Sequence, residues 1–292
     1  MRLFEYLRPT SLPEALDLMA ELGDQAELLA GGTSLINMAK LGLAEPEHVV
    51  ALAGVPELHG LTGSRDGGLT FGAMATIRDV ETSPLVRELA PGLGEAASHV
   101  ATVRIRNQAT VGGNLVHADP NQDLPPMLMV HDAVARVRGP EGVREVPVTD
   151  LFVGFFETVL ADGEILESVH VPPAPAGLRT GYLKFLPRTR DDYPTVSVAA
   201  GLVVQDGQVT DARLAVAGGG ATTLRCRAAE SVLLGSDVGD RTPQQALAAA
   251  ADALAGELEP IGDGRGSSRY KTEMARVSSR RLLDRLRQEA SA

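Results

Sequence analysis

The chain has 292 residues, of which 44% are hydrophobic and 22% charged, and its formal net charge is −11. This length predicts two or three domains, and the composition is that of a globular protein. The negative charge opposes binding to nucleic acid and to an anionic membrane surface, so neither is expected as a partner.

The single cysteine, Cys226, narrows the chemistry further. One cysteine cannot form a disulfide framework, a zinc ribbon or a cysteine-ligated iron–sulfur cluster within this chain, and it is typical of a reducing compartment. The amino-terminal stretch MRLFEYLRPTSLPEA has only short apolar pieces, unlike a signal peptide, and no apolar run approaches the ~18 residues of a membrane span. We therefore expect a cytoplasmic protein without a membrane span.

The amino-terminal third predicts short strands alternating with helices. Ser11-Leu12-Pro13-Glu14 has the S-x-x-E form of a capping box, with proline in the first turn. Apolar residues at helical spacing follow as far as Gly23, which predicts a helix over this stretch. Strands are expected over residues 4–9, 26–30, 48–52 and 68–74, a helical turn over 35–40, and a further helix from Ser83-Pro84.

The remaining elements complete an α+β pattern. Residues 108–115 look strand-like, and residues 123–130 are expected to be helical. Hairpins are predicted for 133–138 with 143–148 and for 196–205 with 209–217, the second across Asp206-Gly207. The stretch PPAPAGLRT (172–180) is rich in proline and glycine and predicts a domain boundary. Helices over 243–258 and 268–289 end the chain, which predicts an α+β fold.

Two similar glycine pairs are the strongest functional signal. LLAGGTSL (28–35) and QATVGGNL (108–115) each place Gly-Gly between an apolar lead-in and a polar exit. Glycine reaches positive φ and has no Cβ, so peptide N–H groups beside it can approach an anion such as a pyrophosphate. Hydroxyl and amide groups of Thr33, Ser34, Thr110 and Asn114 would add contacts. Two plain turns would give the same pattern, and the residues alone leave both interpretations open.

Other common motifs are absent from the sequence. There is no G-x-G-x-x-G after a strand, no G-x-x-x-x-G-K-[ST] and no G-x-S-x-G. Residues 119–123, from Asp119 to Asp123, have the D-x-N-x-D form in which a calcium loop begins, but the glycine and the final glutamate of such a loop are missing. The histidines lack metal-ligand spacing. No metal site is therefore expected. Asp123 has two open interpretations, a helix N-cap or a ligand-binding residue.

A charged segment lies in the second half of the chain. KFLPRTRDDYP (184–194) gathers Lys184, Arg188, Arg190, Asp191 and Tyr193. Composition alone favours a solvated loop here.

Longer stretches resemble a known family. LLAGGTSLINMAK (28–40) and RIRNQATVGGNLVHADPNQDLPP (104–126) resemble the two FAD-binding loops of the flavin subunit of molybdenum-containing hydroxylases. This is the family of the carbon monoxide dehydrogenase medium subunit and of the xanthine dehydrogenase flavin domain. The stretches 184–202, 215–230 and 267–283 extend the resemblance over nearly the whole chain. The two loops at this separation are specific to the family, whereas either loop alone is not.

The resemblance implies a fold. It implies a vanillyl-alcohol-oxidase (PCMH)-type FAD-binding domain over residues 1–175, with subdomains at about 1–55 and 56–175. It also implies a CO dehydrogenase flavoprotein-like C-terminal domain over residues 176–292, with a three-stranded antiparallel sheet and helices.

The resemblance also implies a site for non-covalently bound FAD, without an acid or base catalyst and without a metal. Both loops would surround the pyrophosphate, Asp123 would contact the polyol region, and Tyr193 would gate access to the flavin. The implied cofactor-binding residues are Leu29, Ala30, Gly31, Gly32, Thr33, Ser34, Leu35, Thr110, Val111, Gly112, Gly113, Asn114, Asp123, Leu166 and Lys184.

Two positions depart from the family pattern. Thr33 stands where several members have histidine, a change that could alter the surroundings of the flavin. Thr223-Leu224-Arg225 lacks the proline that often precedes the arginine, in the C-terminal domain, where the change is expected to affect the fold little.

The resemblance finally implies partners and a role. A large molybdopterin-binding subunit and a small 2Fe-2S subunit would join this chain, with a dimer of heterotrimers as the expected assembly. Molybdopterin and the clusters would lie only in those partners, and electrons would pass through FAD to NAD⁺, a quinone or oxygen. A stand-alone flavin oxidase of the same fold and a diverged scaffold subunit without redox activity are the alternatives.

Overall fold

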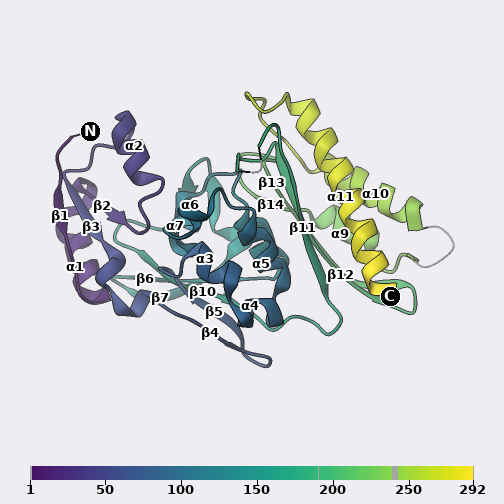
Figure 1. Cartoon of the computed structure of the whole chain (residues 1–292), viewed down its shortest axis with the longest axis horizontal. Helices are drawn as coiled ribbons and strands as arrows, with labels where there is room; N and C mark the ends of the chain where they lie inside the picture. Colours follow the sequence, from purple (N-terminus) through teal and green to yellow (C-terminus); the bar gives the residue numbers. More distant parts are fainter. Residues whose placement is uncertain (1, 190, 239–242, 292) are drawn as a thin grey trace.

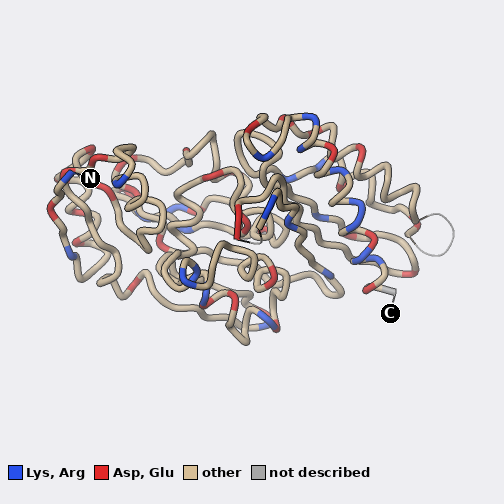
Figure 2. Tube along the Cα trace, turned by 45° about the horizontal axis from the view of Figure 1, so that its top comes forward, with Lys and Arg blue, Asp and Glu red and all other residues tan. Residues whose placement is uncertain are grey.

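Three of the four β-sheets in the described residues follow one another along the long axis of the molecule, and the fourth is a two-stranded hairpin (Figure 1). The computed structural model describes residues 2–189, 191–238 and 243–291. Acidic and basic residues are interspersed along the chain, and Lys and Arg recur along the carboxyl-terminal helix (Figure 2). No helix in the described ranges is long and apolar enough to cross a membrane.

The first sheet is small and parallel. Its strands are β1 (Glu5–Leu7), β3 (His48–Ala51) and β2 (Ala26–Leu29), in that order, with helices α1 (Leu12–Leu22) and α2 (Leu35–Leu41) and short 3₁₀ turns at Gly23–Gln25, Leu52–Gly54 and Pro56–Leu58. The predicted cap of α1 is confirmed, since Ser11 Oγ accepts a hydrogen bond from the Glu14 N–H at 3.3 Å. The Glu14 carboxylate reaches back one residue further than a capping box requires, to the Thr10 N–H at 2.7 Å.

The middle sheet is antiparallel and carries most of the core. Its strands are β4 (Leu61–Ser64), β5 (Gly68–Gly72), β10 (Ile165–Val171), β6 (Val134–Gly139) and β7 (Gly142–Pro147), in that order. The predicted β6–β7 hairpin is confirmed. Beside the sheet lie α3 (Ile77–Thr82), α4 (Pro84–Leu89), α5 (Pro91–Ser98), α6 (Val103–Arg106), α7 (Val111–His117) and α8 (Leu124–Val130). A 3₁₀ turn at Val148–Asp150 and a hairpin of β8 (Phe152–Gly154) with β9 (Glu157–Thr158) complete this part.

The strand-like prediction for residues 108–115 was wrong, because most of this stretch forms helix α7. Thr110 has extended backbone and makes one isolated bridge with Thr76, so a single residue keeps β character. Its Oγ1 accepts a hydrogen bond from the Gly113 N–H at 3.0 Å and so caps the helix. The β-branched residues that suggested a strand are this cap and a buried helix position.

The carboxyl-terminal sheet is antiparallel and has four strands within the described residues, not the expected three. They are β11 (Arg179–Phe185), β12 (Val196–Gln205), β13 (Gln208–Ala217) and β14 (Leu224–Arg225). The β12–β13 hairpin is confirmed. The extra strand has two residues and forms because the chain turns at Gly218, where φ is +77°, and returns so that Leu224 pairs with Val216. Helices α9 (Arg227–Leu233), α10 (Pro243–Gly256) and α11 (Ser268–Ser291) pack against this sheet (Figure 1).

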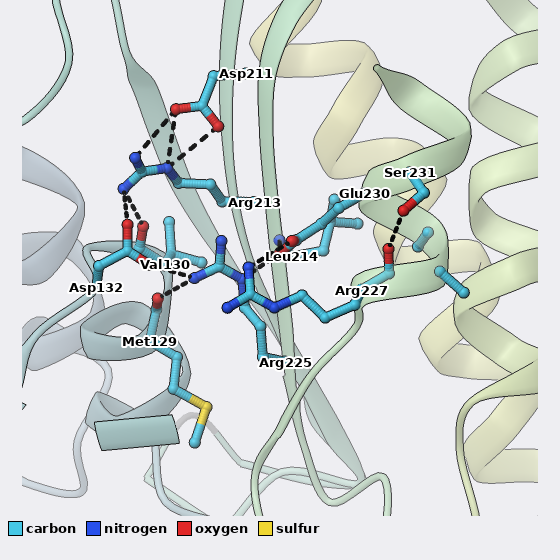
Figure 3. Close-up of polar contacts among 12 residues, drawn as sticks. Met129, Val130, Asp132, Asp211, Arg213, Leu214, Arg225, Arg227, Glu230 and Ser231 are labelled. Carbon is cyan, nitrogen blue, oxygen red and sulfur yellow. Dashed lines mark hydrogen bonds and ion pairs between the residues drawn. The ribbon is translucent and has the colours of Figure 1, made fainter. Parts of the chain in front are cut away.

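Helix α8 joins the middle part to the carboxyl-terminal sheet through an ion-pair cluster at its carboxyl end (Figure 3). Arg213 donates to the Val130 carbonyl at 3.0 Å, and Arg225 donates to the Met129 carbonyl. Both guanidinium groups also lie 2.8 Å from Asp132, and Arg225 is paired with the buried Glu230. The end of a helix leaves carbonyl groups free, and the bond from Arg213 satisfies that of Val130. The Met129 carbonyl accepts from the Asp132 N–H at 3.1 Å as well as from Arg225.

Candidate functional site

Both glycine pairs line one pocket of about 380 Å³. Around it lie the first glycine loop (residues 30–34), the second glycine loop (residues 110–114) at the start of helix α7, and strands β10 and β11. The pocket gathers residues that are far apart in the sequence, since Leu166 and Lys184 lie beside the two loops. Tyr193 lines the same pocket. The lining includes these predicted cofactor-binding residues: Ala30, Gly31, Gly32, Thr33, Ser34, Leu35, Thr110, Gly112, Gly113, Asn114, Asp123, Leu166 and Lys184.

Two of the predicted residues are not among the lining residues. Val111 is 1% exposed and belongs to the core of the middle part, because it lies on the inner face of α7. Leu29 ends strand β2, and its side chain lies next to Gly32, where a Cβ atom would meet Leu29 Cδ1 at 3.1 Å. Val111 and Leu29 thus pack beneath the glycine loops and do not face the pocket.

The glycines allow close backbone contacts around the pocket. A Cβ atom at Gly31 would lie 1.9 Å from the carbonyl oxygen of Gln108, so the first loop touches the lead-in of the second. A Cβ atom at Gly112 would lie 2.7 Å from the Cβ of Ala73. Gly32 has a φ of +71°, which favours glycine. The two pairs thus serve packing between segments, a use that the isolated motifs did not predict.

The two loops differ in the backbone donors that they offer. Among the described residues, no acceptor pairs with the N–H groups of Gly32, Thr33 or Ser34 in the first loop. In the second loop, the N–H groups of residues 111–114 already donate to Ala75, Ala73 and Thr110 at 2.8–3.0 Å. The expectation of an N–H cradle therefore fits the first loop only. The second loop offers side chains instead.

Two of the side chains around the pocket have unpaired acceptor atoms. Neither Asn114 Oδ1 nor Gln122 Oε1 has a hydrogen-bond partner within the described structure, although both atoms are buried. Gln122 is 5% exposed and lines the pocket, yet it was missing from the sequence prediction. Gln122 could not be predicted from the sequence, because a polar residue next to Asp123 indicates a binding site only when it is known to be buried.

Asp123 lies at the centre of a buried polar network. Its Oδ1 accepts a hydrogen bond of 2.6 Å from the Tyr182 hydroxyl, and its Oδ2 accepts one of 2.9 Å from Lys184 Nζ. Lys184 also donates to the His99 carbonyl at 2.8 Å. Burial raises the pKa of Asp123 to about 6, although Lys184 and Tyr182 act in the opposite direction. Burial and the nearby Asp123 raise the pKa of Tyr182.

The structure excludes one of the two interpretations of Asp123, that of a side-chain N-cap. The residue stands at the N-cap position of α8, but its side chain makes no capping hydrogen bond. The carboxylate instead faces Tyr182 and Lys184 of β11, beside the pocket. Asp123 is therefore a polar group of the pocket wall and not a side-chain cap.

Acidic groups outnumber basic ones around the pocket. Lys184 is the one lysine or arginine among the described lining residues, whereas the acids are Glu27, Asp123, Glu164, Asp191 and Asp192. Burial raises the pKa of Glu27. An anionic ligand would therefore be held chiefly by backbone N–H groups of the first loop and by one ammonium group.

The charged segment at 184–194 is only partly solvated. Lys184 is buried, with 1% of its side chain exposed, while Arg188 is exposed and pairs with Asp192 at 3.4 Å. Tyr193 is 43% exposed at the pocket. Arg190 lies outside the described residues. The prediction of a solvated loop thus fails for Lys184, whereas Tyr193 is exposed as well as lining the pocket.

The described part of the chain holds no group of three or more His, Cys, Asp or Glu side chains that could bind a metal ion. Cys226 is buried behind the carboxyl-terminal sheet, where burial raises the pKa of its thiol.

Comparison with known proteins agrees with this geometry. Residues 2–174 match the model of the FAD binding domain in molybdopterin dehydrogenase, and residues 181–286 match that of the CO dehydrogenase flavoprotein C-terminal domain. The carbon monoxide dehydrogenase medium chain of Hydrogenophaga pseudoflava is 37% identical over 96% of both chains. The nicotine 6-hydroxylase medium subunit of Paenarthrobacter nicotinovorans is 35% identical over 95% of both.

A solved structure gives the same relationship in three dimensions. A chain of carbon monoxide dehydrogenase from H. pseudoflava, in a form that lacks the Mo-pyranopterin moiety of its cofactor, superposes with a TM-score of 0.93 at 37% identity and 98% coverage of both chains. The chain belongs to the family of FAD-binding medium subunits of molybdenum hydroxylases, which includes carbon monoxide dehydrogenase medium chains and xanthine dehydrogenase FAD-binding subunits. It is an FAD-dependent oxidoreductase subunit.

The pocket fits this cofactor. FAD combines a pyrophosphate, hydroxyl groups and a large aromatic ring system. The first loop has free N–H donors, Asn114 and Gln122 have unpaired acceptors, and Ile165 and Leu166 add apolar surface. A pocket with mostly apolar walls and a few directed polar groups is typical of a cofactor site.

Proposed function

We propose that this chain carries electrons within a molybdenum hydroxylase of three different subunits. A large partner would oxidise the substrate at its molybdenum cofactor, and a small partner would pass the electrons through 2Fe-2S clusters to FAD in this chain. The final acceptor would be NAD⁺, a quinone or oxygen, and the assembly would be a dimer of such heterotrimers. The observation that carries the proposal is the pocket formed jointly by the two glycine loops and Asp123.

The first loop would hold the pyrophosphate of FAD. Its Gly32, Thr33 and Ser34 N–H groups have no acceptor within the described chain, and Gly31 lets the loop pack on Gln108. An oriented set of N–H donors binds a phosphate group without the need for nearby cations. Thr33, at a position where several relatives have histidine, would contribute a hydroxyl group instead of an imidazole.

Asp123 and Lys184 would act on the polar parts of the flavin. Burial raises the pKa of Asp123 to about 6, so at neutral pH its carboxylate would be available to accept further hydrogen bonds from ligand hydroxyl groups. Lys184 uses donors on Asp123 and the His99 carbonyl, and an ammonium group has three. Its charge would favour negative charge on the reduced ring system.

The bound FAD itself supplies the redox chemistry, since a flavin exchanges electrons singly or in pairs. The chain would position it, limit its contact with water and adjust its potential. Tyr193 would cover the pocket mouth, where its ring is half-exposed. No side chain is needed as a nucleophile or as an acid–base catalyst.

Purification of the chain with its co-expressed neighbours tests the proposal. We expect one large and one small partner to co-purify, and the flavin absorbance of the complex to bleach when the oxidisable substrate of the large subunit is added. If a substrate bleached the flavin of this chain in the absence of both partners, the chain would be a stand-alone oxidase. A complex that assembles with no flavin would indicate a scaffold subunit.

A further inference from the structure

Tyr193, on the pocket wall, is held by an arginine from a distant part of the chain. The guanidinium carbon of Arg265 lies 5.5 Å from the centre of the Tyr193 ring. This distance is within the ~6 Å over which a cation attracts an aromatic face. The ring itself lines the flavin pocket, so Arg265 acts on the edge of the pocket without lining it.

Arg265 is fixed within a tight turn before helix α11. Its N–H donates to Asp263 Oδ1 at 2.8 Å, and its Nη1 donates to Asp263 Oδ2 at 3.1 Å. The backbones of Asp263 and Gly266 exchange two hydrogen bonds of 3.0 and 3.1 Å. Lys271 Nζ, on a side chain that is only 4% exposed, lies 3.0 Å from the same carboxylate. The position of the guanidinium group is therefore defined by the first turn of α11.

The same turn is bonded to the chain next to Tyr193. Thr195 donates through Oγ1 to the carbonyl oxygen of Arg265 at 3.2 Å, and the Thr195 N–H donates to the Phe185 carbonyl at 2.9 Å. Pro194 follows Tyr193, and its ring restricts the backbone of the tyrosine to extended conformations. Thr195, which anchors the turn, and Tyr193, whose ring contacts Arg265, thus lie two residues apart.

An arginine that was merely solvated beside an exposed tyrosine would not need the hydrogen bonds that fix the turn at residues 263–266. Burial and the charges of Asp119 and Asp123 raise the pKa of Tyr193, whereas the charge of Arg265 lowers it. The side chain of Arg265 is 36% exposed. Water therefore competes with the ring of Tyr193 for the guanidinium group of Arg265, but the ion pair with Asp263 keeps this group in place.

We propose that Arg265 is a positioning residue, which holds the ring of Tyr193 across the mouth of the flavin pocket and so slows the release of FAD. The inference rests on the proposed role of the pocket. It means that the carboxyl-terminal part of the chain, through residues 263–266, controls access to a cofactor held mainly by the other parts.

The rate of FAD dissociation tests this proposal. The flavin-loaded complex is mixed with an excess of an apo-oxidase that binds FAD tightly as a trap, and the release of FAD is followed by the activity that the oxidase regains. We expect Arg265→Gln to increase the rate roughly two- to fivefold, as expected for the loss of one exposed cation–π contact. Arg265→Lys keeps the cation and should recover part of the loss. Arg276→Gln is the matched control, because Arg276 lies in helix α11 after this turn and pairs with Asp252 and Glu273, and it should leave the rate unchanged.

A combined variant separates positioning from a general structural effect. If Arg265 acts through the ring, Arg265→Gln should add nothing to the rate of a Tyr193→Ala variant, while Tyr193→Phe should release FAD as slowly as the wild type. An equal effect of Arg265→Gln with and without the ring would overturn the proposal, as would an unchanged rate in the single variant. A wild-type complex that binds no FAD would instead refute the proposed function, and this inference with it.

Discussion

Lys184 donates a hydrogen bond of 2.9 Å to Asp123, and the two residues belong to different parts of the fold. Lys184 lies on β11 of the carboxyl-terminal sheet, and Asp123 precedes helix α8 of the middle part. Both side chains are nearly inaccessible, at 1% and 7% exposure. The pocket wall is therefore completed by an ion pair across two parts of the chain.

Loss of one partner of this pair should weaken the fold. Lys184→Met leaves the Asp123 carboxylate buried with the Tyr182 hydroxyl as its remaining side-chain donor. Removal of one partner of a buried ion pair costs about 3–5 kcal/mol. We expect a loss of this order in the free energy of unfolding, measured by urea denaturation. The double variant Lys184→Met with Asp123→Asn is the control and should be less destabilised than the single variant. Equal or additive losses would contradict the coupling.

Asp123 should also give a defined pH dependence. Its pKa is raised to about 6 in the folded chain, chiefly by burial, against about 3.9 in an unfolded chain. The folded state thus holds the proton more tightly, so this group stabilises the fold below pH ~4 and loses that contribution as the pH rises through 6. The stability of the wild type should fall relative to Asp123→Asn between pH ~4 and ~7. Urea titrations of both proteins across this window measure the difference, and a constant difference would count against the raised pKa.

The contact between the glycine loops should not tolerate a side chain. At Gly31 even a methyl group would lie 1.9 Å from the Gln108 carbonyl oxygen, so Gly31→Ala must separate the two loops. We expect FAD affinity to fall by at least tenfold, about 1.4 kcal/mol, in a fluorescence titration. Gly94→Ala in helix α5 is the control, since its Cβ would meet nothing closer than 3.7 Å. Undiminished affinity in Gly31→Ala would show that the loops need not touch.

The cluster at the carboxyl end of α8 offers a comparison of two arginines on one carboxylate. Arg225 and Arg227 both pair with Glu230, but their side chains are 6% and 64% exposed. Arg225→Gln should cost about 3–5 kcal/mol, because the buried Glu230 loses its buried cationic partner and the Met129 carbonyl loses one of its donors. Arg227→Gln should cost no more than about 1 kcal/mol. Thermal or urea unfolding of both variants decides this, and similar losses would contradict the account.

Much of the fold could be predicted because its signals are local. The Ser11 cap, the hairpin turn at Asp206-Gly207 and the long apolar strands β12 and β13 depend on neighbouring residues, and the structure confirms them. Residues 108–115 were misjudged because β-branched Thr110 and Val111 also suit a strand, whereas the capping of α7 by Thr110 was overlooked. Strand β14 has two residues and forms only through tertiary pairing.

The candidate site was predictable in its glycines but not in its geometry. The family resemblance led to Asp123, Leu166 and Lys184, which come together only in the folded chain. Gln122 and Arg265 carry no motif, because their importance depends on burial and on a contact with a distant residue. The mutual packing of the two loops through Gly31 was likewise invisible in the separate motifs.

The flavin content and reduction of the purified complex test the central claim most directly. The account predicts one FAD per copy of this chain, with absorbance that bleaches on addition of the oxidisable substrate under anaerobic conditions and returns with the electron acceptor. A complex that turns over substrate with this chain present but without flavin would contradict it.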